Sequence, residues 1–82
     1  MRLPCDLSGN ELASSLRRYG YKPTRQTGSH LRLTSTIRGS EHHVTIPRHS
    51  VLRVGTLAAI LTDVAGYLEL DRQDLTDQLF RR

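Results

Sequence analysis

The sequence predicts a single α+β domain in which one helix precedes and a second helix follows three antiparallel strands, with a short third helix at the end. Residues 8–20 and 55–65 carry apolar side chains three and four positions apart, which is the spacing of an amphipathic helix. Between them, residues 21–46 form three short runs, separated by turns that contain glycine. Helices that cover one face of an antiparallel meander make a two-layer α+β fold.

The length and composition indicate one small domain, residues 1–82, with a modest core. Cys5 is the only cysteine, so an internal disulfide is impossible and an intracellular setting fits. No run is apolar enough to span a membrane. Because Pro4, Asp6 and Ser8 interrupt any signal-peptide core, we expect a cytoplasmic protein with no membrane partner.

The first helix has a clear start. Residues 1–6 read as a loose lead-in or a short edge strand. Ser8 is the expected N-cap, and Glu11, three residues later, completes a capping box. Gly20 is expected to end the helix. Its apolar face comprises Leu12, Leu16 and Tyr19.

Three strands are expected next. Residues 21–26 form a weak strand, and Pro23 cannot donate a ladder hydrogen bond, so this strand belongs at an edge or pairs irregularly. Residues 27–29 form a tight hairpin turn. The clearest strand is 30–37, and a third strand covers 42–46.

Side chains alternate across a strand, so each strand separates a polar face from an apolar face. In the second strand, the polar face carries His30, Arg32, Thr34 and Thr36, and the apolar face carries Leu31, Leu33 and Ile37. In the third strand, His43 and Thr45 are polar-facing, whereas Val44, Ile46 and a partly buried His42 face the core.

The second helix is expected to end at Gly66, and Asp71 is the expected N-cap of the last helix. The buried face of the second helix comprises Leu57, Ile60, Leu61 and Val64. The apolar residues of the last helix are Leu75, Leu79 and Phe80.

The positive charge is concentrated in the middle of the chain. Residues 17–53 contain eight Lys or Arg and one acid, Glu41, whereas residues 54–82 contain three Arg and five acids. All four histidines lie in the basic segment. Such a patch is typical of proteins that bind a phosphate backbone, and the alternative is an ordinary solvated surface.

The polar strand face combines residue types that suit proton transfer and phosphate binding. Histidine moves protons near neutral pH, and arginine binds two phosphate oxygens at once. His30 and Arg32 share this face, and Arg25 lies across the hairpin. Lys22 extends the track for the RNA backbone, and Arg48 binds either phosphate or an acidic partner protein. The alternative for His30 is a surface histidine without a function.

Other sites are less well supported. His30, His42, His43 and His49 lack ligand spacing and a cysteine cluster, so we expect no metal and no cofactor. Cys5 has no base beside it to make it a nucleophile. His49 contacts RNA or a partner, or caps the second helix.

Three blocks of the sequence resemble the HicA family of toxins from prokaryotic toxin–antitoxin systems. They are Arg25-Gln26-Thr27-Gly28-Ser29-His30, Val44-Thr45-Ile46-Pro47-Arg48-His49 and Gly55-Thr56-Leu57-Ala58-Ala59-Ile60-Leu61. With the first helix, the resemblance covers about residues 7–66.

The resemblance implies a fold like that of double-stranded-RNA-binding domains and a ribonuclease that cuts mRNA. It also implies neutralisation by a HicB-type antitoxin. The family's catalytic histidine lies in its Gly-Ser-His block, and here it corresponds to His30.

Two other functions remain open. A non-catalytic RNA-binding module of the same fold would bind RNA in a salt-dependent way without cutting it. A pure protein-interaction subunit fits the basic face less well. Because aromatic side chains are few, RNA contacts are expected mainly at the backbone, with low sequence specificity.

Overall fold

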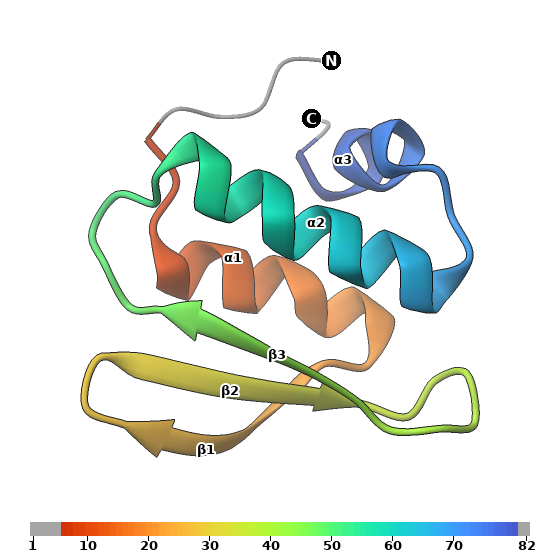
Figure 1. The fold of residues 1–82 in the computed structure, drawn as a ribbon, viewed down its shortest axis with the longest axis horizontal. Helices are drawn as coiled ribbons and strands as arrows, with labels where there is room; N and C mark the ends of the chain where they lie inside the picture. Colours follow the sequence, from red (N-terminus) through yellow and green to blue (C-terminus); the bar gives the residue numbers. More distant parts are fainter. Residues whose placement is uncertain (1–5, 81–82) are drawn as a thin grey trace.

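The structure is a computed structural model, which describes residues 6–80. It confirms the predicted order of elements (Figure 1). The elements are α1 (Gly9–Leu16), a 3₁₀ turn η1 (Arg17–Tyr19), β1 (Lys22–Thr27), β2 (His30–Ser35), β3 (His42–Pro47), α2 (Val54–Leu68) and α3 (Arg72–Phe80). Cys5 and most of the expected lead-in lie outside the described residues. Within residues 6–80, no helix is long and apolar enough to cross a membrane.

The three strands form one antiparallel sheet in the order β1-β2-β3. Thr27 pairs with His30 across a two-residue turn, in which Gly28 has a φ of +55°. The predicted irregularity of the first strand is confirmed, because the register of β1 shifts between Pro23 and Arg25. Thr24 is the extra residue of this β-bulge.

The helices form a second layer on one face of the sheet. Figure 1 shows α1 and α2 side by side near β3, with α3 beyond α2 and β1 as the strand farthest from the helices. All six residues of β1 are accordingly exposed. The core between the layers includes Leu12, Leu16, Leu33, Val44, Ile46, Leu57, Leu61, Val64 and Leu75.

The predicted capping box of α1 is present. Ser8 Oγ accepts a hydrogen bond from Glu11 N at 3.1 Å, and Ser8 N donates to Glu11 Oε1 at 2.9 Å. The bond from Ser8 N, together with a smaller contribution from the Ser8 hydroxyl, lowers the pKa of the Glu11 carboxyl. After the 3₁₀ turn, Gly20 ends the helical segment with a φ of +81°, in the left-handed region that favours glycine.

Gly9 allows α1 to approach the end of β3. Its N–H donates to the carbonyl oxygen of His49 at 3.0 Å. A Cβ atom at this position would lie 2.0 Å from the carbonyl oxygen of Pro47, so no other residue type fits without displacing the backbone. Because Pro47 pairs with His30, this contact fixes the strand beside the start of β2.

The prediction that Ile37 faces the core is wrong. β2 ends at Ser35, and 55% of Ile37 is exposed. The Ser35 hydroxyl accepts from Ile37 N at 3.3 Å and donates to the Tyr19 carbonyl at 2.7 Å. A serine that binds the backbone in this way competes with the strand ladder and ends the alternation.

The prediction that Gly66 ends the second helix is also wrong, because α2 continues to Leu68. Tyr67 holds the extra turn in place, since its hydroxyl accepts from Arg38 N at 3.0 Å and donates to Ser40 O at 2.5 Å. The helix ends at Glu69, which has a φ of +58°.

The start of α3 agrees with the prediction. The Asp71 carboxylate accepts from Gln73 N at 3.0 Å, as expected of an N-cap. Leu75 is buried against the core, and Leu79 and Phe80 pack on it while partly exposed.

His42 is partly buried, as predicted, and it lies in a polar cluster. The Tyr21 hydroxyl lies 2.6 Å from His42 Nδ1, and His42 Nε2 lies 3.1 Å from Asp63 Oδ1. The imidazole stacks on Tyr67, with ring centroids 4.6 Å apart. With the hydroxyl donating to Nδ1, Nε2–H donates to the carboxylate, so the cluster links β3 to α2.

Candidate nucleic-acid interface on the open sheet face

The face of the sheet that the helices leave uncovered is polar, as the alternation predicts. Leu31, Leu33 and Ser35 of β2 point toward the helices, and the residues between them point away. The resulting open face carries Lys22, Thr24, Arg25, Thr27, His30, Arg32, Thr34, His43 and Thr45.

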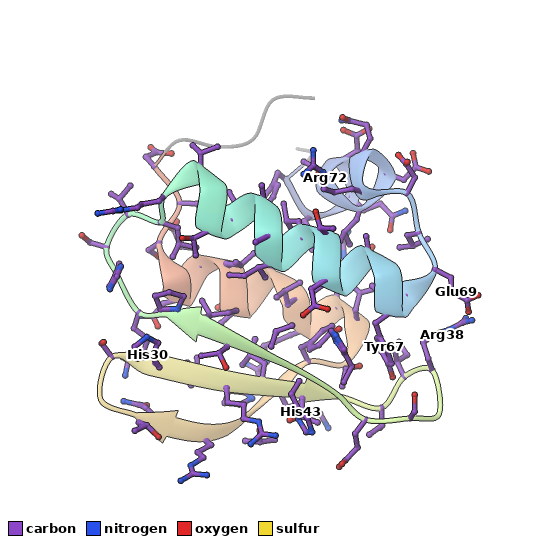
Figure 2. The ribbon with its side chains drawn as sticks, in the orientation of Figure 1. His30, Arg38, His43, Tyr67, Glu69 and Arg72 are labelled. Atoms are coloured by element: carbon purple, nitrogen blue, oxygen red, sulfur yellow. The ribbon has the colours of Figure 1, made fainter. Side chains whose placement is uncertain are left out.

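His30 lies in an open pocket formed by all three strands, which we call the His30 pocket. The pairs Thr27–His30, Arg25–Arg32 and Arg32–Thr45 bring its residues together. Figure 2 shows His30 at the end of the sheet next to the β1–β2 hairpin. The pocket is lined by Arg25, Thr27, His30, Arg32 and Thr45.

The groups that could act on a phosphate in this pocket are not engaged elsewhere in the part of the chain that the structure describes. Within residues 6–80, the His30 imidazole has no hydrogen-bond partner, so both ring nitrogens are available. Arg25 and Arg32 have no acidic partner in the same range. The pocket therefore presents one imidazole and two uncompensated guanidinium groups, which suits an anion.

Further along the face, side-chain hydrogen bonds cross the sheet. The hydroxyls of Thr24 and Thr34 lie 2.8 Å apart, and Thr34 Oγ1 lies 2.7 Å from His43 Nδ1. The bulge makes this possible, because it lets the neighbouring residues Thr24 and Arg25 both contribute to the open face. The sequence predicted irregular pairing here but gave no sign of which side chains it would bring together.

His43 does not share the pocket of His30. His30 pairs with Pro47, and His43 pairs with Thr34, four residues farther along β2. At the usual rise of a strand this offset is about 13 Å, and Figure 2 shows the two side chains well apart. They cannot act together on one phosphate.

The sites expected in the β3–α2 loop lie away from the pocket. Arg48 N donates to Ser29 O at 2.6 Å, but Arg48 Nε reaches Asn10 of α1 at 3.3 Å. The guanidinium is thus directed toward α1 and does not line the pocket. His49 does not cap α2, since the N-cap position, Arg53, has no side-chain capping bond.

A second pocket lies next to the first on the same face. Lys22 pairs with Thr34 there, and Gly20 and Ile37 close its end. We call it the threonine pocket, and it is lined by Gly20, Lys22, Thr24, Thr34, Thr36 and Ile37. Within residues 6–80, no group of three or more His, Cys, Asp or Glu side chains is arranged to hold a metal ion.

Comparison with known families identifies the kind of protein to which this face belongs. A family model described as "HicA toxin of bacterial toxin-antitoxin" matches residues 9–65, more than half of the chain. The chain belongs to the HicA toxin family. Neither the comparison with curated proteins nor that with solved structures gives a match.

Membership has consequences at the level of the family. This HicA chain is a toxin of a toxin–antitoxin system, and such a system implies an antitoxin partner. The HicA family is a family of ribonuclease toxins. The matched residues extend from α1 into α2 and include the whole sheet and both pockets. Helix α3 lies outside the match.

Proposed function

We propose that this HicA toxin is a metal-independent endoribonuclease that cuts mRNA, with His30 as its catalytic residue. The observation that supports this most is the His30 pocket, in which a free imidazole lies with Arg25 and Arg32 on an open face. Family membership supplies the reaction class.

The proposed reaction uses the substrate's own 2′-hydroxyl as nucleophile. His30 takes the proton of this hydroxyl, the oxygen attacks the adjacent phosphorus, and the bond to the 5′-oxygen breaks. The products are a 2′,3′-cyclic phosphate and a 5′-hydroxyl, and the leaving oxygen takes a proton from solvent. Among the residues that line the pocket, His30 alone can move a proton at neutral pH.

The arginines stabilise the charge that builds on the phosphate. Arg32 lies two residues from His30 on β2, and Arg25 of β1 pairs with Arg32. A guanidinium can donate to two phosphate oxygens at once. Lys22 lines the adjacent pocket, and Arg48 is held next to the β1–β2 hairpin by its backbone bond to Ser29; both bind neighbouring phosphates. Backbone contacts of this kind give weak sequence preference.

The deciding experiment compares the parent with His30→Ala on single-stranded mRNA in excess chelator. We expect cleavage to fall by about 10²–10⁴-fold in the variant, the usual contribution of a general base. RNA affinity should be largely retained, because the arginines remain. His43→Ala is the matched control, since it removes an exposed histidine of the same face outside the pocket, and its rate at saturating RNA should be unchanged.

Two outcomes would contradict the proposal. Undiminished cleavage by His30→Ala would show that another residue is catalytic. A mobility shift without cleavage by either protein would favour the non-catalytic RNA-binding module. A substrate with 2′-deoxyribose at the cleavage position should resist the parent, since it lacks the nucleophile.

The antitoxin is proposed to be of the HicB type and to cover the His30 face with an acidic surface. Within residues 6–80 the lysine and arginine side chains of this face have no acidic partner, and complementary charge steers association. Modification of His30 by diethyl pyrocarbonate should therefore be slower in the toxin–antitoxin complex than in the free toxin. Equal labelling of His30 in both would exclude direct occlusion of the pocket.

A further inference from the structure

The threonine pocket has no part in the chemistry proposed for His30, yet it lies on the same face. The two pockets are neighbours along β2, because Arg32 lines one and Thr34 lines the other. Two residues of a strand span about 7 Å. An extended chain that fills the His30 pocket can therefore continue directly into the threonine pocket.

Polar groups in the threonine pocket are available to a ligand. Within residues 6–80, Lys22 has no acidic partner and the Thr36 hydroxyl has no hydrogen-bond partner. The Thr24 and Thr34 hydroxyls are held in place by their mutual bond of 2.8 Å. None of the described residues that line the pocket is acidic. An ammonium beside a row of hydroxyls suits a phosphate and a sugar.

An apolar side chain completes the pocket. Ile37 is 55% exposed because the strand ends at Ser35, so it is not part of the core. It lines the pocket together with Thr36 and is farther from His30 along the chain than the other lining residues of this segment. The exposed Ile37 side chain, in the same pocket as the Lys22 ammonium, gives an apolar surface that a base or ribose can contact.

We propose that the threonine pocket is a second subsite for single-stranded RNA, which binds the next nucleotide of the strand, outside the two that flank the cleaved linkage. Lys22 binds its phosphate, Thr36 binds a ribose hydroxyl or phosphate oxygen, and Ile37 contacts its base. This inference rests on the proposed ribonuclease function, because that function supplies RNA as the ligand. It adds Thr36 and Ile37 as substrate-positioning residues and predicts that the protein prefers substrates longer than a dinucleotide.

The test uses RNA binding in the full chain carrying His30→Ala, so that cleavage does not interfere. Fluorescence anisotropy compares a dinucleotide with oligonucleotides extended on the 5′ or the 3′ side. We expect extension on one side to raise affinity. Thr36→Val and Ile37→Ser, both at surface positions, should remove much of this gain while leaving dinucleotide affinity unchanged. For Ile37→Ser we expect the affinity for the extended RNA to fall about fourfold for each CH₂ group that the RNA buries in the parent.

Salt dependence separates the role of Lys22 from a general loss of charge. Lys22→Gln should reduce the slope of log affinity against log salt by about 0.7, the value for one phosphate contact with a single strand. Arg72→Gln is the matched control, because it removes one positive charge from α3, which Figure 2 shows on the far side of the helices from the sheet. The salt slope of Arg72→Gln should equal that of the protein that carries His30→Ala alone.

Each result bears on the subsite separately from the ribonuclease. If extension of the RNA gives no gain, or if the gain survives in both variants, the subsite is excluded even when the parent cuts RNA. If the variants weaken only the binding of a partner protein, the pocket belongs to that interface and the proposal is wrong. Loss of the length-dependent gain in affinity in the two variants would support the subsite. This result would hold even if the parent protein proves to bind RNA without cutting it.

Discussion

At the scale of single residues, Gly9 has the strictest structural requirement. Its missing side chain lets the start of α1 lie against the carbonyl of Pro47, which pairs with His30. We expect Gly9→Ala to lower the free energy of unfolding by about 3 kcal/mol, the upper part of the range for overpacking, because the clash is with backbone. Urea denaturation would measure this, and an unchanged midpoint would contradict it.

Gly66→Ala is the matched control for that change. Gly66 lies inside α2, and an added Cβ atom would have no atom within 4 Å apart from its chain neighbours and the backbone of its own helix. The same substitution should therefore raise the free energy of unfolding, by roughly 0.5–1 kcal/mol, since alanine restricts the unfolded chain and favours a helix. Opposite signs at the two glycines would show that local space decides the effect.

Much of the candidate site follows from alternation along one strand. His30 and Arg32 fall on one face because they are two residues apart, and a hairpin brings Arg25 opposite. The cluster around His42 could not be predicted in the same way. Its partners Tyr21 and Asp63 lie 21 positions away on either side, and no local pattern specifies contacts at that distance.

At the scale of elements, the capping box of α1 is the feature most open to a stability test. Ser8→Ala removes the acceptor for Glu11 N and the smaller contribution of the Ser8 hydroxyl to the lowered pKa of Glu11. We expect the free energy of unfolding to fall by about 1 kcal/mol. Ser8→Thr keeps the hydroxyl and should remain close to the parent in thermal unfolding. Equal stability of Ser8→Ala and the parent would show that the cap contributes little.

The ends of elements were harder to predict than the elements themselves. Gly20 and Gly28 take positive φ where turns were expected, because local sequence alone sets those bends. Gly66 was misassigned because contacts of Tyr67 with the β2–β3 turn extend α2 past it. Ile37 was misassigned because the Ser35 side chain ends the strand early.

At the scale of the whole molecule, Tyr21 connects the layers. Its ring is fully buried, and its hydroxyl contacts His42 on β3, which in turn contacts Asp63 on α2. Burial raises the pKa of the Tyr21 phenol, with smaller contributions from Tyr67 and Asp63. The phenol therefore stays neutral in the folded state at a pH where the unfolded chain ionises.

This difference predicts how stability depends on pH. The stabilisation is fully present below the ordinary phenol pKa of 10.0, and it is lost as the pH rises from there toward the higher folded-state value. Tyr21→Phe should be less stable at neutral pH by about 1 kcal/mol, from the lost hydrogen bond, and should decline less steeply in alkali. Chemical denaturation across this range would measure both; parallel profiles would contradict the assignment.

The bulge in β1 also bears on how copies of the protein meet. β1 is one of the two edge strands of the sheet and is exposed along its whole length, so its free backbone groups face solvent. Pro23 lacks an N–H, the register shift at Thr24 interrupts the regular ladder, and Lys22 and Arg25 place like charges on the same rim. If β1 of a second copy approached β1, it could not form a regular ladder of backbone hydrogen bonds, and the like charges would repel. The irregularity that shapes the open sheet face thus also opposes pairing of β1 with β1 of a second copy.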